Sequence, residues 1–237
     1  MRVLLPIPLI AWLAVFPCAC NPDASKSPAT APDGSIADLP LLPAAPGDAW
    51  IYQVRLRIPA GVTSATAAEV DTTYQSVRTF LGKVSAGEGL PESDCFEVIV
   101  PGSPREREFV EIQTDRILMR GSQVMRSETT RPLWLEQPAP FVTAGMKAGD
   151  SLPDFVSMDG GIIRRTKIIG REDVTVPAGI FRCIRLLTTG SDGELDLRRT
   201  IWFAPGTGIV REEKARYRRN QLVLREVHEL VELRRAL

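Results

Sequence analysis

The chain has 237 residues, with 29 Lys and Arg against 29 Asp and Glu, one His and four Cys. This neutral balance excludes a global field for nucleic acid, and one His leaves little room for a His-based metal cluster or a His-rich acid–base site. With 24% charged and 44% hydrophobic residues, the chain is neither disordered throughout nor a membrane protein of many spans.

Residues 1–20 have the pattern of an export signal and are not predicted to belong to the fold. Arg2 precedes an uncharged run over residues 3–16, which is too short for a membrane-spanning helix of about 20 residues. A basic start, a short apolar run and small residues before a processing site are typical of a secretory signal. The protein is therefore predicted to leave the cytoplasm.

The end of this signal suggests a lipid anchor. Residues 16–20 read Phe-Pro-Cys-Ala-Cys, and the step from Ala19 to Cys20 resembles the lipobox of bacterial lipoproteins. The resemblance implies that Cys20 becomes the lipidated first residue, and a triacylated Cys carries enough hydrocarbon for stable attachment to a membrane. Because Asn21 is not Asp, the sorting rule of Gram-negative lipoproteins implies the outer membrane. The alternative is a plain signal cleaved near Ala19, which would leave a soluble periplasmic protein.

Residues 21–46 are predicted to form a flexible tether. They contain six Pro among scattered Ser, Ala, Asp and Gly, a composition that buries no core and behaves as an extended linker. Such a tether lets a globular domain stand off a membrane surface. Residues 47–237 are predicted to form a single β-rich domain, with two meander halves that meet near residues 133–152.

From Trp50 onward, hydrophobic residues recur mostly with period two, which indicates half-solvated strands. Strands are predicted over residues 51–58, 73–84, 95–100, 106–114, 116–119, 123–129, 162–169, 179–189, 194–203, 208–218 and 222–233. Turns rich in Gly, Pro and Asp separate many of them. Connections of a few residues favour an antiparallel meander, and no long amphipathic helix is evident. The fold class is therefore predicted to be mainly β with little helix.

Charged residues are densest in the predicted strand 208–218. Their alternation with other residues is typical of a solvated sheet face with cross-strand charge pairs. The isolated His228 is predicted to be a surface or packing residue.

The strand pattern breaks at residues 133–152, where Pro residues exclude a central strand. The apolar residues of this segment suggest that it lies across one sheet face. It is either a connection packed on the core between two halves or a cover over an apolar ligand groove. The groove would have an apolar ligand face made of Trp134, Leu135, Phe141 and Trp202.

Two Cys remain in the predicted domain, Cys95 and Cys183. An exported compartment is oxidising, so an even pair is a candidate disulfide. The alternative is two buried free thiols that act as small hydrophobes. The sequence favours neither, because it does not show whether the two Cβ atoms meet.

Two segments carry a resemblance to known families. Residues 174–186 read VTVPAGIFRCIRL, and residues 200–211 read TIWFAPGTGIVR. A Val-Pro-Ala-Gly turn, a Phe-x-Cys strand and a later Trp-Phe-Ala-Pro-Gly-x-Gly segment resemble uncharacterised bacterial periplasmic and lipoprotein families. The resemblance implies a curved antiparallel meander sheet or half-barrel, similar in general shape to lipoprotein carriers such as LolA and LolB. It implies no enzyme activity.

No phosphate-binding loop, serine-nucleophile motif or zinc-protease motif is present in the sequence. No catalytic residue, metal site or cofactor is therefore predicted. The resulting hypothesis is a non-enzymatic cell-envelope lipoprotein, held to the membrane by its lipid anchor, that binds an apolar ligand or a lipidated client on its sheet face. The alternatives are a structural or assembly protein that docks other envelope proteins, and a soluble secreted periplasmic protein. No nucleic-acid partner is expected.

Overall fold

The computed structural model describes residues 41–62, 64, 66–126, 131–156 and 163–236. These residues form only β-strands and turns, so this part of the chain contains no helix that could cross a membrane. The strands are β1 (Ala49–Ile58), β2 (Val70–Ser85), β3 (Glu92–Ile99), β4 (Arg105–Ile112), β5 (Arg116–Met125), β6 (Leu133–Thr143), β7 (Phe155–Val156), β8 (Ile163–Val176), β9 (Gly179–Ser191), β10 (Asp196–Ala204), β11 (Gly208–Arg218) and β12 (Gln221–Arg234). The predicted mainly β fold is confirmed.

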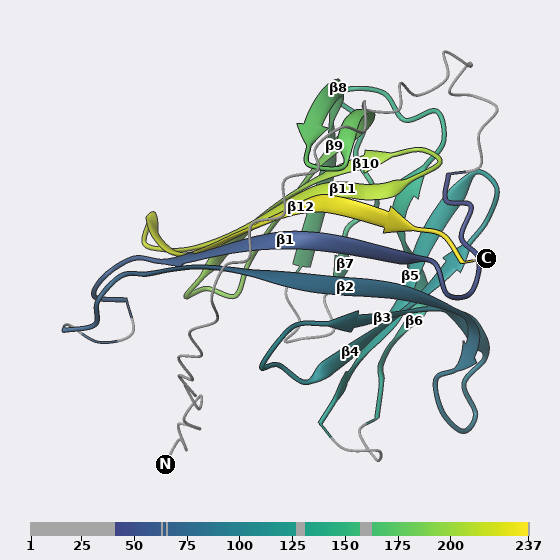
Figure 1. Ribbon diagram of the computed structural model, residues 1–237, viewed down its shortest axis with the longest axis horizontal. Helices are drawn as coiled ribbons and strands as arrows, with labels where there is room; N and C mark the ends of the chain where they lie inside the picture. The colour runs from purple at the N-terminus through teal and green to yellow at the C-terminus, as the bar shows by residue number, and fades with distance from the viewer. Residues whose placement is uncertain (1–40, 63, 65, 127–130, 157–162, 237) are drawn as a thin grey trace, which may run out of the picture.

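All twelve strands belong to one antiparallel sheet in the order β6-β5-β4-β3-β2-β1-β12-β11-β10-β9-β8-β7. The chain runs outward from β1 to β6 and returns from β7 to β12, which pairs with β1 at the centre of the sheet (Figure 1). Short turns join several neighbouring strands, such as β8 to β9, β10 to β11 and β11 to β12. Between β11 and β12, Arg219 and Asn220 both have positive φ, as a two-residue hairpin turn that matches the twist of its strands requires.

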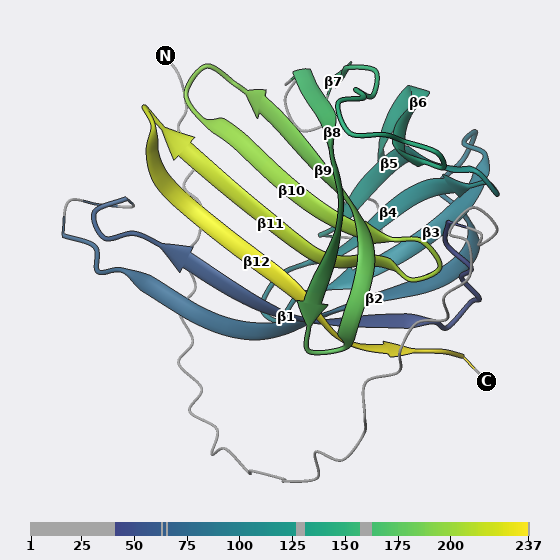
Figure 2. The same cartoon turned by 90° about the horizontal axis from the view of Figure 1, so that it is seen from above.

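The sheet curls into a nearly closed barrel, so that the strands near its two edges face each other (Figure 2). Register shifts interrupt many of the strand pairs, for example between Phe80 and Gly82 and between Trp202 and Phe203. Such bulges increase local twist and bend a strand, which allows the sheet to close. Gly82 adopts a φ of +81° at its bulge and lies against Pro46, a conformation that a larger residue would reach only with strain.

Some predictions about strands were wrong. The strand predicted over residues 162–169 continues to Val176 in β8. Residues 133–143 are not a segment lying across a sheet face, because they form the edge strand β6. The Pro residues that exclude a central strand are tolerated at an edge, where an N–H need not be donated to a neighbour. The predicted strands 116–119 and 123–129 are a single strand, β5, within the described residues.

The turns predicted within residues 174–186 and 200–211 are confirmed. Pro177 and Ala178 form the connection between β8 and β9, and Gly179 follows with a φ of +137°. Residues 205–207 connect β10 to β11, which brings Phe203 opposite Ile209 in the sheet.

Large apolar side chains fill one end of the barrel, which we call the packed end. Its core is made of side chains such as Leu42, Trp50, Phe96, Phe203 and Ile209. Trp50 is 2% exposed, and its indole Nε1 donates a 2.6 Å hydrogen bond to the carbonyl of Thr207. The ring of Phe96 meets Trp50 edge-on, with 5.6 Å between ring centroids.

The N-terminal boundary of the fold lies earlier than the composition predicts. Leu41 and Leu42, which fall inside the predicted tether, are buried at the packed end. Nearby, the buried carboxylate of Asp48 accepts hydrogen bonds from the backbone N–H of Ala45, the backbone N–H of Ala236 and the guanidinium of Arg235. This carboxylate therefore ties the start of the described chain to its C-terminal end.

Candidate functional site

The end of the barrel opposite the packed end contains a cavity of about 420 Å³, which we call the hollow. Two walls of the curled sheet line it: β4, β5 and β6 on one side, and β7 to β11 on the other. The antiparallel register explains this arrangement. On β4 the lining begins at Glu106 and on β10 at Leu197, near the strand ends that lie away from Val110 and Phe203 of the packed end.

Much of the hollow is apolar. Its lining includes Met119, Val124, Leu133, Ala139, Pro140, Phe141, Phe155, Leu186, Leu197 and Ile201. Val124 and Leu133 are 37% and 48% exposed, whereas Leu186 and Ile201 are buried, so the lining runs from accessible to enclosed apolar surface. A lining of this kind favours contact with hydrocarbon.

The hollow also contains charged side chains, and the two walls differ in sign. Glu106 and Glu108 of β4 line one wall. Arg199 of β10 and Lys214 and Arg216 of β11 line the other. Because these charges are partly removed from bulk water, their interactions are stronger than those of surface charges.

Glu212 anchors the cationic wall. Its side chain is 10% exposed, forms an ion pair with Arg199, and lies 3.4 Å from the ammonium of Lys214. Burial alone would raise the pKa of Glu212, but the charges of Arg199 and Lys214 hold that pKa far below its usual range. This carboxylate is therefore ionised at neutral pH.

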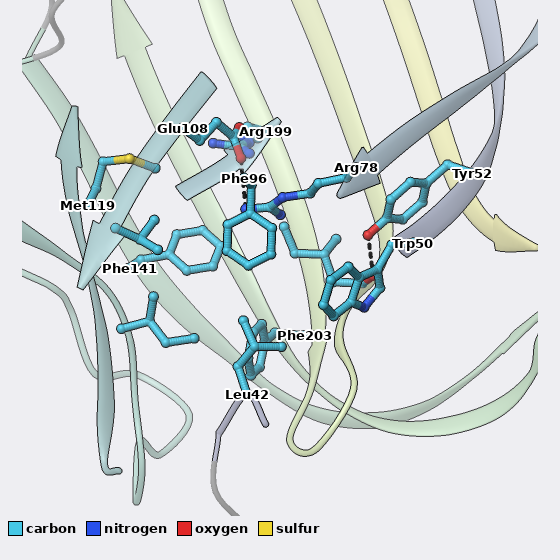
Figure 3. A pocket seen from close by; sticks show the side chains of 14 residues that line it. Leu42, Trp50, Tyr52, Arg78, Phe96, Glu108, Met119, Phe141, Arg199 and Phe203 are labelled. Atoms are coloured by element: carbon cyan, nitrogen blue, oxygen red, sulfur yellow. Dashed lines mark hydrogen bonds and ion pairs between the residues drawn. The ribbon is translucent and has the colours of Figure 1, made fainter. Parts of the chain in front are cut away.

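Below the hollow, a small space of about 30 Å³ leads into the packed end. Figure 3 shows Glu108, Arg199 and Arg78 above Phe96, Phe203 and Trp50. The guanidinium of Arg78 lies 2.7 Å from the carboxylate of Glu108 and 4.1 Å from the ring centroid of Phe96. A pair of opposite charges thus separates the charged hollow from the aromatic core.

Glu106 differs from its neighbours on the charged walls. In the described part of the chain its carboxylate has neither an ion pair nor a hydrogen bond, although it lines the hollow. Burial raises the pKa of Glu106, and the nearby charge of Glu108 raises it further. The hollow therefore holds a carboxylate whose charge is poorly compensated.

The four residues of the predicted apolar ligand face do not lie together. Phe141 lines the hollow. Trp134 instead packs on Phe109, with 5.7 Å between ring centroids, and Leu135 is half-buried outside the lining of either space. Trp202 is 8% exposed, lies between the guanidinium groups of Arg185 and Arg211, and donates its indole N–H to Glu172. The apolar face of the protein is therefore the lining of the hollow.

The two Cys of the domain are free and buried. Cys95 lies on β3 and Cys183 on β9, and five other strands separate these two in the sheet. Burial raises the pKa of the Cys95 thiol to about 11 and that of Cys183 to about 12, so both stay protonated and weakly nucleophilic at neutral pH. Cys20, the predicted lipid anchor, lies outside the described residues.

His228 packs in the barrel, as predicted. Its side chain is 13% exposed, lies 3.6 Å from Glu226, and meets the ring of Tyr52 edge-on. The prediction for the charges of residues 208–218 was wrong in part. Glu213 pairs with Arg225, as a cross-strand pair should, but Glu212 and Lys214 belong to the charged interior.

No protein-family model matches this chain, and no curated protein matches it. Two solved structures are similar to it. The first is a candidate exported protein with a YmcC-like fold from Bacteroides fragilis, with 14% identity and a TM-score of 0.49, covering 83% of this chain and 100% of that one. The second is a candidate lipoprotein from Parabacteroides distasonis, with 13% identity and a TM-score of 0.48, covering 83% of this chain and 99% of that one.

Likenesses at this level do not inform the function of this chain. Its own fold and site define a class: a nearly closed antiparallel β-barrel with one packed end and one hollow end. The hollow is therefore the feature of this chain that bears on its function.

Proposed function

We propose that this protein is a non-enzymatic, lipid-anchored envelope protein that binds an amphipathic ligand in its hollow. The observation that carries the proposal is the cavity of about 420 Å³ between two walls of apolar and charged side chains. Small-molecule sites are typically concave, of about 300–1,000 Å³, mostly apolar and supplied with a few polar groups. A ligand with a hydrocarbon part and a polar part matches this lining better than a purely apolar one.

The energetics support a binding role. Charged side chains inside a protein cost free energy when they lose water, and this cost is often not recovered by pairing. At the packed end several of the same strands carry large apolar side chains in contact with one another. A barrel selected for stability alone would continue that packing along its whole length, so the charged hollow is best explained by a ligand.

The first test is to identify what the protein carries. The protein would be purified from a bacterial membrane host, and its bound molecules would be extracted and identified by mass spectrometry. A bound acyl-chain amphiphile and displacement of a fluorescent fatty acyl probe are the expected results. A protein that carries no amphiphile and binds no such probe would contradict the proposal, and a specific envelope partner recovered by crosslinking would then favour a docking role.

A pair of variants separates the hollow from the rest of the surface. Leu197→Trp adds bulk inside the hollow, whereas Arg198→Trp adds the same side chain to the next residue of β10, which is exposed and outside the hollow's lining. Leu197→Trp should reduce probe binding about tenfold, the loss expected when about 1.4 kcal/mol of contact is excluded. Arg198→Trp should bind as the unchanged protein does, and equal losses in both variants would place the ligand elsewhere.

The anchor is tested separately from the ligand. Cys20→Ala removes the only side chain of the proposed lipidation step, and it should move the protein from the membrane fraction to the soluble fraction. Outer-membrane fractionation of the unchanged protein is expected from Asn21. If Cys20→Ala still fractionates with membranes, the protein is not held by a lipid on this residue.

A further inference from the structure

Among the described residues, besides the exposed Arg216, the hollow contains two charges of opposite sign that its own ion pairs do not fully compensate. One belongs to Lys214 and the other to Glu106, and these residues come from opposite walls. In the sheet, β11 and β4 are separated by β12, β1, β2 and β3, so the two residues face each other only because the sheet curls.

Lys214 shares its partner with a second cation. Glu212 forms an ion pair with Arg199 and also lies 3.4 Å from Lys214. One carboxylate between two cations leaves one positive charge over. Lys214 carries that excess at the surface of the hollow, because its side chain is 37% exposed and its contact with Glu212 is long.

Glu106 lacks a direct partner on the opposite wall. Its neighbour Glu108 has a partner of its own, because the guanidinium of Arg78 lies 2.7 Å away. Among the described residues no cation lies within ion-pair distance of Glu106, although Lys214, Arg199 and Arg78 are near enough to act on it electrostatically. A partly buried carboxylate in this state is costly unless a cation joins it.

We propose that the hollow takes a zwitterionic amphiphile, which places a phosphate or carboxylate against Lys214, an ammonium against Glu106 and its hydrocarbon chain on the apolar lining. Glu106 then gains a partner that the described residues do not supply, and Lys214 gains one that it does not share with Arg199. A cavity of about 420 Å³ lies toward the small end of ligand sites, which favours a single-chain amphiphile. This inference deepens the proposed function and rests on it.

Three probes with one lauroyl chain and different headgroups test the proposal. Lysophosphatidylethanolamine carries both a phosphate and an ammonium, lysophosphatidylglycerol carries the phosphate alone, and monolauroylglycerol carries no charge. Binding to the full chain would be measured below the micelle-forming concentrations by calorimetry. The expected order of affinity is ethanolamine, then glycerol phosphate, then the uncharged probe, with steps of about tenfold, the size expected for one charge-assisted contact.

Two variants assign the headgroup contacts. Glu106→Gln should remove the preference for the ethanolamine over the glycerol headgroup and leave binding of monolauroylglycerol unchanged. Lys214→Gln should weaken both phospholipid probes about tenfold, again without effect on the uncharged probe. Glu111→Gln is the matched control, because Glu111 lies on the same strand as Glu106, pairs with Arg120, and does not line the hollow.

The outcomes separate this inference from the proposed function. If all three probes bind with similar affinity, the hollow is an apolar site and the zwitterion assignment is overturned while the proposed function stands. Tighter binding of the glycerol phosphate probe would make the hollow an anion site and would also overturn it. If no probe binds, both proposals fall. Circular dichroism of each variant confirms that a lost affinity does not reflect a lost fold.

Discussion

The packed end and the hollow share the strands β4, β5, β6, β10 and β11, yet their interiors differ. On β4 the interior position at the packed end is Val110, and at the hollow it is Glu106. On β11 the corresponding pair is Ile209 and Lys214. Both regions lie on strands that run through them without a break, although the pairing of β4 with β5 and of β10 with β11 shifts register between the two.

This difference indicates where stability is obtained and where it is given up. Burial of apolar surface contributes about 25 cal/mol per Å², and the large aromatic side chains of the packed end are buried. The hollow leaves apolar surface uncovered and holds charges that have lost water. Substitutions at the packed end should therefore lower the free energy of unfolding. Substitutions in the hollow should change this free energy little but should weaken ligand binding.

The largest effect is expected at the packed end. Phe96 is 2% exposed and contacts the rings of Trp50 and Phe80. Phe96→Ala should lower the free energy of unfolding by about 4 kcal/mol, the usual cost of emptying a buried aromatic site. Chemical denaturation followed by tryptophan fluorescence measures this loss. Leu197→Ala in the hollow is the comparison, and a loss as large as that of Phe96→Ala would show that the hollow is also packed.

A smaller loss of stability is expected when the ion pairs between Glu212 and the cations of the hollow are removed. Glu212→Gln leaves Arg199 and Lys214 without their shared carboxylate, and we expect unfolding to become easier by about 2 kcal/mol, because both cations still reach solvent in the hollow. Glu213→Gln, one residue along β11, breaks a more exposed pair with Arg225 and should cost less than about 1 kcal/mol. Equal effects in the two variants would show that the interior pair is no stronger than a surface pair.

The same carboxylate predicts how stability changes with pH. The pKa of Glu212 in the folded protein lies below its unfolded value of about 4.3, so its contribution is present above that value and is lost as the pH falls toward the folded pKa. Denaturation curves measured between neutral and strongly acidic pH should therefore be flatter for Glu212→Gln than for the unchanged protein. Parallel curves would mean that other carboxylates control the acid transition.

The contact of Asp48 with residues 235–236 should contribute still less to the free energy of unfolding. Burial raises the pKa of Asp48, but hydrogen bonds from the backbone N–H groups of Ala45 and Ala236 and from Arg235 lower it by more. Asp48→Asn keeps the shape and removes the charge, which should lower the free energy of unfolding by about 1.5 kcal/mol. Proteolysis near the C-terminus should also become faster, and an unchanged rate would show that the end stays docked without the carboxylate.

Much of the fold was predictable because period-two alternation is a local signal. The strand ending at Ile58 and the turns at Pro177 and Pro205 follow from residue types and their immediate neighbours. The strand β6 was missed because Pro excludes only a central strand, and the sequence alone does not show which strand lies at an edge.

The site was less predictable because it depends on long-range curvature. Trp134 and Trp202 are large and apolar, which made them natural candidates, but each packs away from the hollow. Glu106 and Lys214 lie in segments whose charged residues are typical of an exposed sheet face. Only the closure of the sheet brings that charged face inside, and alternation alone does not distinguish an inner face that is wet and charged from an outer one.

Glu106→Gln should have the smallest effect on stability and the most informative one. The pKa of Glu106 is raised in the folded protein, so its ionised form opposes folding at neutral pH, and this opposition fades as the pH falls through the folded pKa. Replacing the carboxylate by an amide should therefore leave the free energy of unfolding unchanged or raise it by up to about 1 kcal/mol. Thermal denaturation measures this change.

The stability of Glu106→Gln has to be compared with the affinity of this variant for the lauroyl probes. A residue kept for packing would cost stability when replaced, whereas a residue kept for a ligand can be removed at no such cost. A variant that is as stable as the unchanged protein, but that no longer distinguishes an ammonium headgroup from a glycerol headgroup, would assign Glu106 to binding. A clear loss of stability would instead make Glu106 a partner within the ion pairs of the barrel, and the two ends would then differ only in the polarity of their cores.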